Sequence, residues 1–200
     1  MRILHTSDWH LGRVLHGQSL LEDQEHALDQ ILDHLIRDGY DALIVAGDVY
    51  DRAVPPPDAV SLLGSFLQRL AEADIQAIII AGNHDSATRL GFADGIMDRA
   101  GIHIRSDYTR LSEPVTLVDG NGVEVDVFAL PFVEVALLRE ALDLGQDDVR
   151  TTSEAVAGAL DSMREVRRED VPTILVSHEF VGSGAITSDS ERVFIGGAHV

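Results

Sequence analysis

Four short polar clusters carry residue types that bind metal ions, and each of them directly follows a run of apolar residues. The clusters are Ser7-Asp8-Trp9-His10, Gly47-Asp48-Val49-Tyr50-Asp51, Gly82-Asn83-His84-Asp85 and Ser177-His178-Glu179. Carboxylate oxygen, amide oxygen and neutral imidazole together suit Mn, Fe or Zn, and the chain has no Cys thiolate to favour softer ions. A lone Asp-x-His occurs by chance in many proteins, whereas four such clusters in equivalent positions indicate one shared metal site.

The chemistry gives each of five side chains a part in such a site. Asp8 and His10 are two positions apart and project to the same side of an extended segment. Asp48 could bridge two ions with its two oxygens, Asn83 offers a neutral oxygen that limits the negative charge, and His178 supplies a nitrogen from another strand. Two ions roughly 3.5–4 Å apart would hold the attacking and leaving oxygens of a phosphate ester and generate hydroxide near neutral pH. The alternative is turn or cap chemistry, because Asp and Asn favour loop starts.

The elements that must bring these clusters together are short buried strands alternating with amphipathic helices. Strands are predicted at residues 2–6, 41–46, 76–81 and 172–177. Between the first three, apolar residues recur at helical spacing from Ala27 to Ile36 before a stop at Gly39, and a second helix opens at Pro55-Pro56-Pro57-Asp58. This βαβαβ order predicts an α/β fold with a parallel sheet, at whose carboxyl edge ligands bind.

The middle of the chain has a different pattern. Strands at residues 115–118 and 123–129 flank Asp119-Gly120-Asn121-Gly122, which is a strong hairpin signal. Residues 134–144 and 153–168 are predicted to be helical, and residues 181–197, rich in Gly and Ser, to form a long loop. The sequence shows no internal repeat and no domain boundary, so we expect one domain.

The composition limits the class of protein. Of 200 residues, 34 are Asp or Glu and 15 are Lys or Arg, a formal net charge of −19 that argues against unaided nucleic-acid binding through a basic surface. The absence of Cys excludes a disulfide scaffold and a thiol nucleophile, and it suits a reducing compartment. The longest apolar run, residues 77–81, is far shorter than the ~18 residues of a membrane span, and the first residues show no signal peptide. We therefore expect a cytoplasmic α/β domain.

These clusters, in this order, resemble the motifs of the calcineurin-like metallophosphoesterase superfamily, which are D-x-H, G-D-x-x-D, G-N-H-[DE] and a later His. Within the superfamily the chain is similar to the SbcD family of bacterial nuclease subunits. The similarity lies in residues 2–12, residues 47–51 followed by Pro55-Pro56-Pro57, residues 82–86, residues 128–132 and residues 188–192. The resemblance implies a layered α/β fold, with central mixed β-sheets flanked by helices and the active site at the carboxyl ends of strands.

The same resemblance implies a role for each site residue. One ion would be bound by Asp8 and His10, the other by Asn83 and His178, and both by Asp48. We expect two divalent ions. Mn is the expected metal, and Zn and Fe are the alternatives. His84 would face the phosphate and protonate the leaving group, or serve instead as a third metal ligand. Asp51 would pair with His84, raise its pKa and fix its tautomer, or else cap the loop before the prolines.

The resemblance also implies an activity and partners. Arg52 and His16 are candidate substrate contacts, and the alternative for Arg52 is a solvated surface position. The implied activity is metal-dependent hydrolysis of phosphodiester bonds at DNA ends or hairpins, in repair and recombination, with an SbcC-like coiled-coil ATPase as partner and two copies of each protein. A small-molecule phosphodiesterase or a phosphoprotein phosphatase would use the same site. The non-enzymatic alternative is a partner-binding fragment with an incomplete metal site.

The end of the chain departs from the family pattern. The family completes both ions with a G-H-x-H pair near the end of the catalytic domain, whereas this chain ends Gly196-Gly197-Ala198-His199-Val200. We therefore expect residues 1–200 to be a nuclease domain truncated before its last His motif, with the capping domain absent. Each ion would then lack one histidine, and its affinity would fall.

Overall fold

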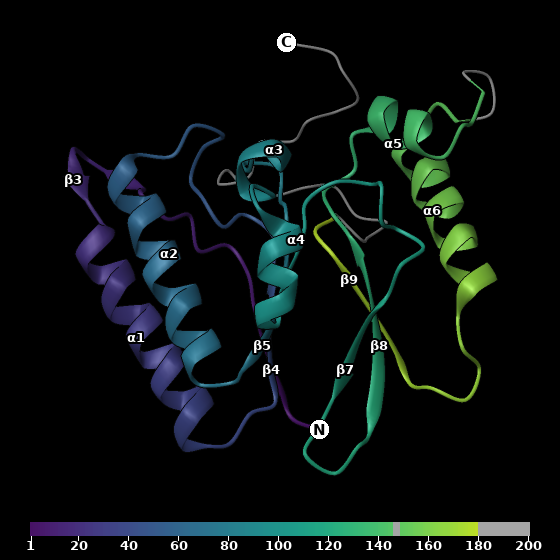
Figure 1. Ribbon diagram of the computed structural model, residues 1–200. Coiled ribbons are helices and arrows are strands. Elements are labelled where there is room, and N and C mark those ends of the chain that lie inside the picture. The colour runs from purple at the N-terminus through teal and green to yellow at the C-terminus, as the bar shows by residue number, and fades with distance from the viewer. Residues whose placement is uncertain (146–148, 180–200) are drawn as a thin grey trace, which may run out of the picture.

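The predicted alternation of strands and helices builds a parallel sheet. In the computed structural model, which describes residues 1–145 and 149–179, its strands are β1 (Ile3–Thr6), β4 (Ala42–Ala46), β5 (Gln76–Ile80) and β6 (Ile102–Arg105), in the order β1-β4-β5-β6. β4 is buried throughout and β5 nearly so. Both are apolar because helices cover one face of this sheet and a second sheet covers the other (Figure 1).

Two long helices, α1 (Leu21–Arg37) and α2 (Pro57–Glu72), pack on the outer face of the first sheet (Figure 1). α1 buries Leu28, Leu32 and Leu35, which recur at the spacing of one helical turn. α2 begins with a proline at its first position, where the missing N–H costs nothing. Its Phe66 is 1% exposed and meets the ring of Trp9 edge-on, with 5.3 Å between ring centroids. This layer therefore supports the loop that follows β1.

The second sheet contains β7 (Val115–Val118), β8 (Glu124–Leu130) and β9 (Thr173–Ser177), with β7 antiparallel and β9 parallel to the central β8. Helices α5 (Val135–Ala141) and α6 (Thr152–Val166) cover its outer face. An apolar layer that includes Ile44, Ile78 and Val127 joins the two sheets. The result is the expected layered fold, helices on both sides of two sheets (Figure 1). The predicted hairpin, both later helices and the late strand are confirmed.

Several short elements have no counterpart in the sequence prediction. The hairpin β2 (Val14–Leu15) and β3 (Gln18–Ser19) follows the D-x-H segment, and α3 (Ala87–Leu90), α4 (Asp94–Met97), a 3₁₀ turn (Asp98–Ala100) and β6 follow the G-N-H-D segment. These elements are too short to show a period in the sequence. The loop expected at residues 181–197 and the terminal His199 lie outside the described residues, as do residues 188–192.

An ion pair between the half-exposed Arg168 and the buried Asp126 holds the segment after α6 against β8. Asp126 is fully buried, and its carboxylate accepts hydrogen bonds from Arg168 Nε at 2.8 Å and Nη2 at 2.6 Å, and from Thr116 Oγ1 at 2.7 Å. The Arg168 guanidinium holds the pKa of Asp126 below its usual range. The contact fixes the chain just before β9, the strand that leads to His178.

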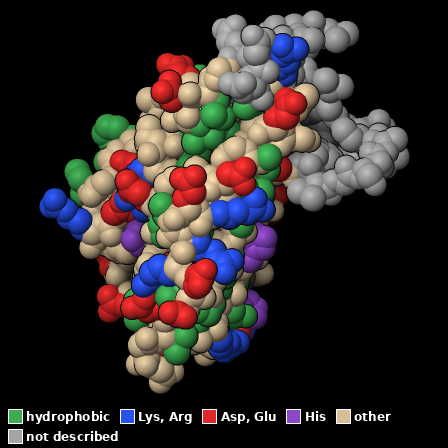
Figure 2. Space-filling model, turned by 90° about the vertical axis from the view of Figure 1, so that its right-hand side faces the viewer, with side chains coloured by type: hydrophobic (Ala, Val, Ile, Leu, Met, Phe, Trp, Pro, Cys, Tyr) green, Lys and Arg blue, Asp and Glu red, His purple; other side chains and the backbone are tan. Residues whose placement is uncertain are grey.

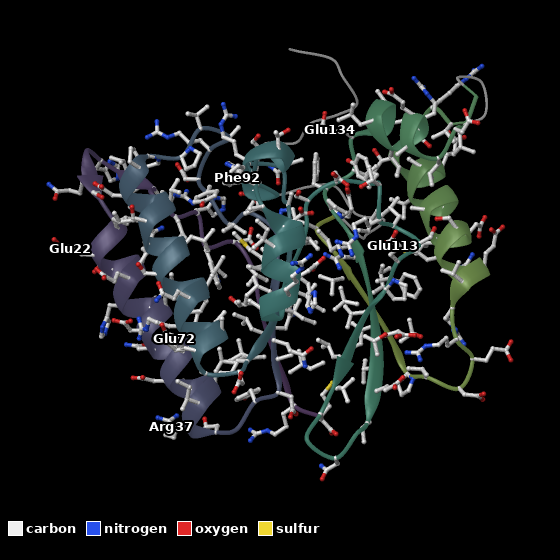
Figure 3. The ribbon with its side chains drawn as sticks, viewed as in Figure 1. Glu22, Arg37, Glu72, Phe92, Glu113 and Glu134 are labelled. Atoms are coloured by element: carbon white, nitrogen blue, oxygen red, sulfur yellow. The ribbon has the colours of Figure 1, made fainter. Side chains whose placement is uncertain are left out.

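The surface of the described residues has two features that bear on function. The face seen in Figure 2 carries acidic and basic side chains side by side. Phe92 and Ile96, around α3 and α4, are 78% and 73% exposed, and Phe92 lies toward the upper end of the molecule in Figure 3. Within residues 1–145 and 149–179, no helix is long and apolar enough to span a membrane.

Candidate metal centre

The four predicted clusters meet where the two sheets adjoin. Three follow strands of the first sheet: β1 leads to Asp8 and His10, β4 to Asp48, and β5 to Asn83 and His84. The fourth, with His178, follows β9 and so belongs to the second sheet. His178 Nδ1–H donates a hydrogen bond to the Ala46 carbonyl oxygen at 2.7 Å, which joins the sheets at this point.

Asp48 lies at the middle of the site. Its side chain is 4% exposed, and its Oδ2 lies 3.7 Å from His10 Nε2, 3.9 Å from His84 Nε2 and 3.6 Å from His178 Nε2. Two groups of possible ligands share this residue, and the ligand atoms within each group lie within 4.8 Å of one another. One group is His10, Asp48 and His84, and the other is Asp8, Asp48 and His178.

Asp8 and Asn83 border these groups. Asp8 Oδ1 lies 3.9 Å from His10 Nε2, although Asp8 forms a group with His178. Asn83 Oδ1 lies 3.2 Å from His178 Nε2, so Asn83 adjoins the second group. Asp8 is therefore within reach of a cation on either side of Asp48, and its pairing with His10 on one ion stays a prediction.

Two of the histidine rings, those of His84 and His178, are oriented by hydrogen bonds on the nitrogen that faces away from Asp48. His84 Nδ1–H donates to the backbone carbonyl of Asp51 at 2.8 Å, as His178 does to Ala46. Such a partner fixes the proton on Nδ1 and leaves the Nε2 lone pair for a metal or a proton. Both rings therefore present Nε2 to the same carboxylate.

The backbone at the site is strained. Asp8, His10 and Asp48 have φ values of 58°, 46° and 50°, in the left-handed region that costs side chains of this kind about 1–3 kcal/mol each. A ladder between the two loops helps to hold them, because Asp8 N–H donates to Gly47 O at 3.1 Å and His10 N–H to Asp48 O at 2.9 Å. Strain of this kind persists where surrounding contacts over-determine the conformation.

The loop after β5 is hydrogen-bonded to the loop after β4 through a carboxylate from each loop. Asp48 Oδ1 accepts the His84 N–H at 2.9 Å. In return, Asp85 accepts the N–H groups of Val49 at 3.0 Å, Tyr50 at 2.9 Å and Gly82 at 2.9 Å. Burial nevertheless raises the pKa of Asp85. The sequence prediction gives Asp85 no role. Its position as the last residue of the G-N-H-[DE] motif is the sequence feature that could have indicated one.

The titration of the site suits cation binding. Burial raises the pKa of Asp48, but His178 and the His84 amide outweigh this and hold it below its usual range. Burial lowers the pKa of His10. Burial also lowers the pKa of His178, yet the Asp48 carboxylate and the Ala46 carbonyl outweigh this and bring it to about 9. At pH 7 Asp48 is therefore ionised and His10 neutral, and a cation that binds His178 Nε2 displaces a proton.

Asp51 contacts His84 through its backbone, and the expected pairing through its carboxylate stays a prediction. The Asp51 group that accepts a hydrogen bond from His84 is the backbone carbonyl oxygen, not the carboxylate. The Asp51 carboxylate lies instead 3.6 Å from His10 Nδ1 and 3.9 Å from Arg13 Nε. The reason is local, since the chain turns after Tyr50 so that Asp51 N–H bonds Leu11 O at 3.2 Å. Arg13 is thus a neighbour of the site that the sequence does not indicate.

The two candidate substrate contacts lie on the surface. Arg52 is exposed in the loop between β4 and α2. His16 is exposed at the tip of the β2–β3 hairpin, where its φ of 50° and the 80° of Gly17 suit a two-residue hairpin turn. Neither side chain belongs to the two ligand groups around Asp48, so their role in binding substrate stays a prediction.

The residues present fit a pair of divalent cations. The Nε2 atoms of three histidines lie 3.6–3.9 Å from Asp48 Oδ2. These distances are too long for hydrogen bonds, so none of the three nitrogens is hydrogen-bonded to that oxygen. The oxygens come from Asp8, Asp48 and Asn83, and the donor set of carboxylate, amide and imidazole suits Mn, Fe or Zn. Cations bound here would neutralise the carboxylates of Asp8 and Asp48. Neither of the two ligand groups contains a Lys or Arg that could do so.

Two glycines leave the room that the site requires. A Cβ at Gly47 would lie 2.5 Å from the His178 ring, and a Cβ at Gly82 would lie 2.1 Å from Asp48 Oδ1 and 2.2 Å from Asp48 N. Contacts so short would force the backbone or the bridging carboxylate to move.

Gly82→Ala is therefore expected to weaken Mn²⁺ binding by about 10–100-fold, as loss of support around a metal site does. Isothermal titration with Mn²⁺ measures this directly. The matched control is Gly64→Ala in α2, where a Cβ would meet nothing within 4 Å; it should keep full affinity and gain helix stability of about 1 kcal/mol. Equal Mn²⁺ affinity in both variants would contradict the tight approach of Gly82 to Asp48.

The chain resembles known proteins in sequence over almost its whole length. The model of the calcineurin-like phosphoesterase family matches residues 1–192. The chain is similar to the SbcD component of the SbcCD nuclease of Staphylococcus saprophyticus, with 38% identity over 193 residues, which are 96% of this chain and 49% of the relative. The chain thus spans about half the length of this curated relative.

Proposed function

The chain belongs to the calcineurin-like phosphoesterase family, and on this premise we propose that it is the catalytic part of a metal-dependent DNA nuclease subunit of the SbcD kind. It would hydrolyse phosphodiester bonds at DNA ends or hairpins with two divalent cations, for which Mn²⁺ is the metal we propose. The observation that carries the proposal is that Asp48 belongs to both groups of ligand side chains. A carboxylate shared between two ligand groups is what a two-ion phosphoesterase site requires.

The chain's own residues would divide the work of hydrolysis. Asp8 and His10 would hold one cation, Asn83 and His178 would hold the other, and Asp48 would contact both. When bound, the cations polarise the phosphoryl oxygen and make water a better nucleophile. His84 gives a proton from Nε2 to the leaving oxygen, while the Asp51 carbonyl holds its ring. Its side chain is 31% exposed, which lets a substrate reach it.

The name of the relative supports a partner for this chain. That protein is part of the SbcCD nuclease, so we propose an SbcC-like ATPase as partner and DNA as substrate in the cytoplasm. The net charge of −19 and the mixed surface in Figure 2 fit DNA contact that depends on bound cations and on the partner. We also propose a homodimer of the chain within the larger assembly.

A substrate comparison tests the proposed function. The chain is incubated in Mn²⁺ with end-labelled linear duplex DNA, a DNA hairpin, bis(p-nitrophenyl) phosphate and p-nitrophenyl phosphate, with and without an SbcC-like partner. We expect cleavage of the DNA and of the diester, a much slower reaction of the monoester, and faster DNA cleavage with the partner. Metal bound per chain is measured alongside and should reach two.

Other outcomes would favour the other functions. Preference for the monoester would indicate a phosphatase, and hydrolysis of the small diester without cleavage of DNA under any condition would indicate a small-molecule phosphodiesterase. A chain that binds no Mn²⁺ and cleaves nothing would be a partner-binding fragment.

A further inference from the structure

Gln24 lies outside every metal-binding motif, yet its side chain contacts the loop of residues 8–12 at three points. Its Nε2 donates to the backbone carbonyl oxygens of Trp9 at 3.0 Å and His10 at 2.7 Å. Its Oε1 accepts the N–H of Gly12 at 3.0 Å. The amide thus uses both of its donor hydrogens and its acceptor on one short stretch of backbone.

These contacts complement the ladder to the neighbouring loop. The ladder takes the N–H groups of Asp8, His10 and Leu11, which donate to carbonyls of residues 47–49. Gln24 instead binds the Trp9 carbonyl and the Gly12 N–H. It also shares the His10 carbonyl with the N–H of Arg13 at 3.0 Å. The loop is therefore held from two sides, once by the loop after β4 and once by α1.

The loop requires such support because of its backbone. Asp8 and His10 both have positive φ, a conformation that other contacts must stabilise. Gly12 is buried, with a φ of 86°, and a Cβ there would lie 2.7 Å from Pro56 Cγ. Gln24, half-buried in the first turns of α1, joins this strained loop to the longest helix that the structure describes.

We propose that Gln24 is a positioning residue that holds Asp8 and His10 in the conformation that binds one of the two cations. The inference rests on the proposed function, because it assigns Gln24 to the metal site named there. A side chain that supports ligands without touching the metal tunes affinity by about 10–100-fold. Because Asn83 and His178 come from other loops, the second cation should be affected much less.

The test compares Gln24→Met with Gln30→Met. Gln30 is on the same helix, but it is exposed, and its amide bonds His26 Nε2 at 2.8 Å on the surface of that helix. Gln24→Glu keeps the length and an acceptor but loses both donors, and it serves as a second variant. Mn²⁺ binding is measured by isothermal titration, and amide hydrogen exchange is measured on the metal-free proteins together with the thermal unfolding midpoint.

Both Gln24 variants should bind one Mn²⁺ about 10–100-fold more weakly and the other nearly as wild type does. Amide exchange should become faster in residues 8–13, with the unfolding midpoint close to that of Gln30→Met. Unchanged affinity at both positions would overturn the inference. So would equal loss at both positions with a lower midpoint, since that indicates a general structural role. Absence of Mn²⁺ binding in the wild type would contradict the proposed function instead, and local exchange would still show whether Gln24 holds the loop.

Discussion

Asp48→Asn is expected to remove both Mn²⁺ ions and to lower phosphodiester hydrolysis by at least about 10³-fold, since metal ions supply several kcal/mol of charge stabilisation in such reactions. Asp48 is the only residue that both candidate ligand groups of the described chain share. Its Oδ1 accepts the His84 N–H, while its Oδ2 faces three imidazoles. An Asn cannot do both, because an oxygen kept for the His84 N–H turns a donor NH₂ group toward the cations.

Asp8→Asn is the contrast for this experiment. Asp8 belongs to one of the two groups, and its side chain is 51% exposed. Its replacement should weaken one Mn²⁺ and leave the other, which titration calorimetry and a metal count per chain can resolve. Two ions retained in Asp48→Asn, or both lost in Asp8→Asn, would contradict the assignment of Asp48 as the shared ligand.

His84→Ala is expected to slow DNA cleavage by about 10²–10⁴-fold, the usual contribution of a general acid. The ring is held at Nδ1 by the Asp51 carbonyl and keeps Nε2 directed at the site. The loss should be much smaller with bis(p-nitrophenyl) phosphate, because p-nitrophenolate is a good leaving group that departs without a proton. The comparison of the two substrates therefore isolates the proton transfer from other effects of the substitution.

The competing role for His84 is that of a metal ligand, since its Nε2 lies in one group with His10 and Asp48. In that case His84→Ala would lose one Mn²⁺ and would slow both substrates equally. A full complement of two ions together with a loss confined to DNA supports the acid. A drop in metal content would refute that role.

Much of the fold could be predicted because its strands and helices carry strong local patterns. The all-apolar β4 and the largely apolar β5 indicate strands covered on both faces, and the turn residues between β7 and β8 indicate a hairpin. The strand β6 escapes prediction because Ile-His-Ile-Arg is four residues long and follows a run of short helical turns. Periodicity cannot distinguish a segment of this length from a loop.

The site could be predicted as far as its motifs, but not as far as the contacts between them. Motif order is enough to predict that the five candidate ligands lie near one another, because polar clusters after buried strands gather at one edge of a sheet. That His178 reaches them from the second sheet depends on the pairing of β9 with β8, which no local pattern specifies. The Asp51 carbonyl and the Gln24 amide are likewise tertiary contacts, and their residue types are common on ordinary surfaces.

The origin of the ligands in two sheets has a consequence for stability. Asp8, His10, Asp48 and Asn83 move with the first sheet, whereas His178 moves with the second, and an apolar layer and hydrogen bonds such as that from His178 to Ala46 join them. Cations bound by ligands of both sheets would add a further link between them, so we expect metal-free protein to unfold at a lower temperature than metal-bound protein.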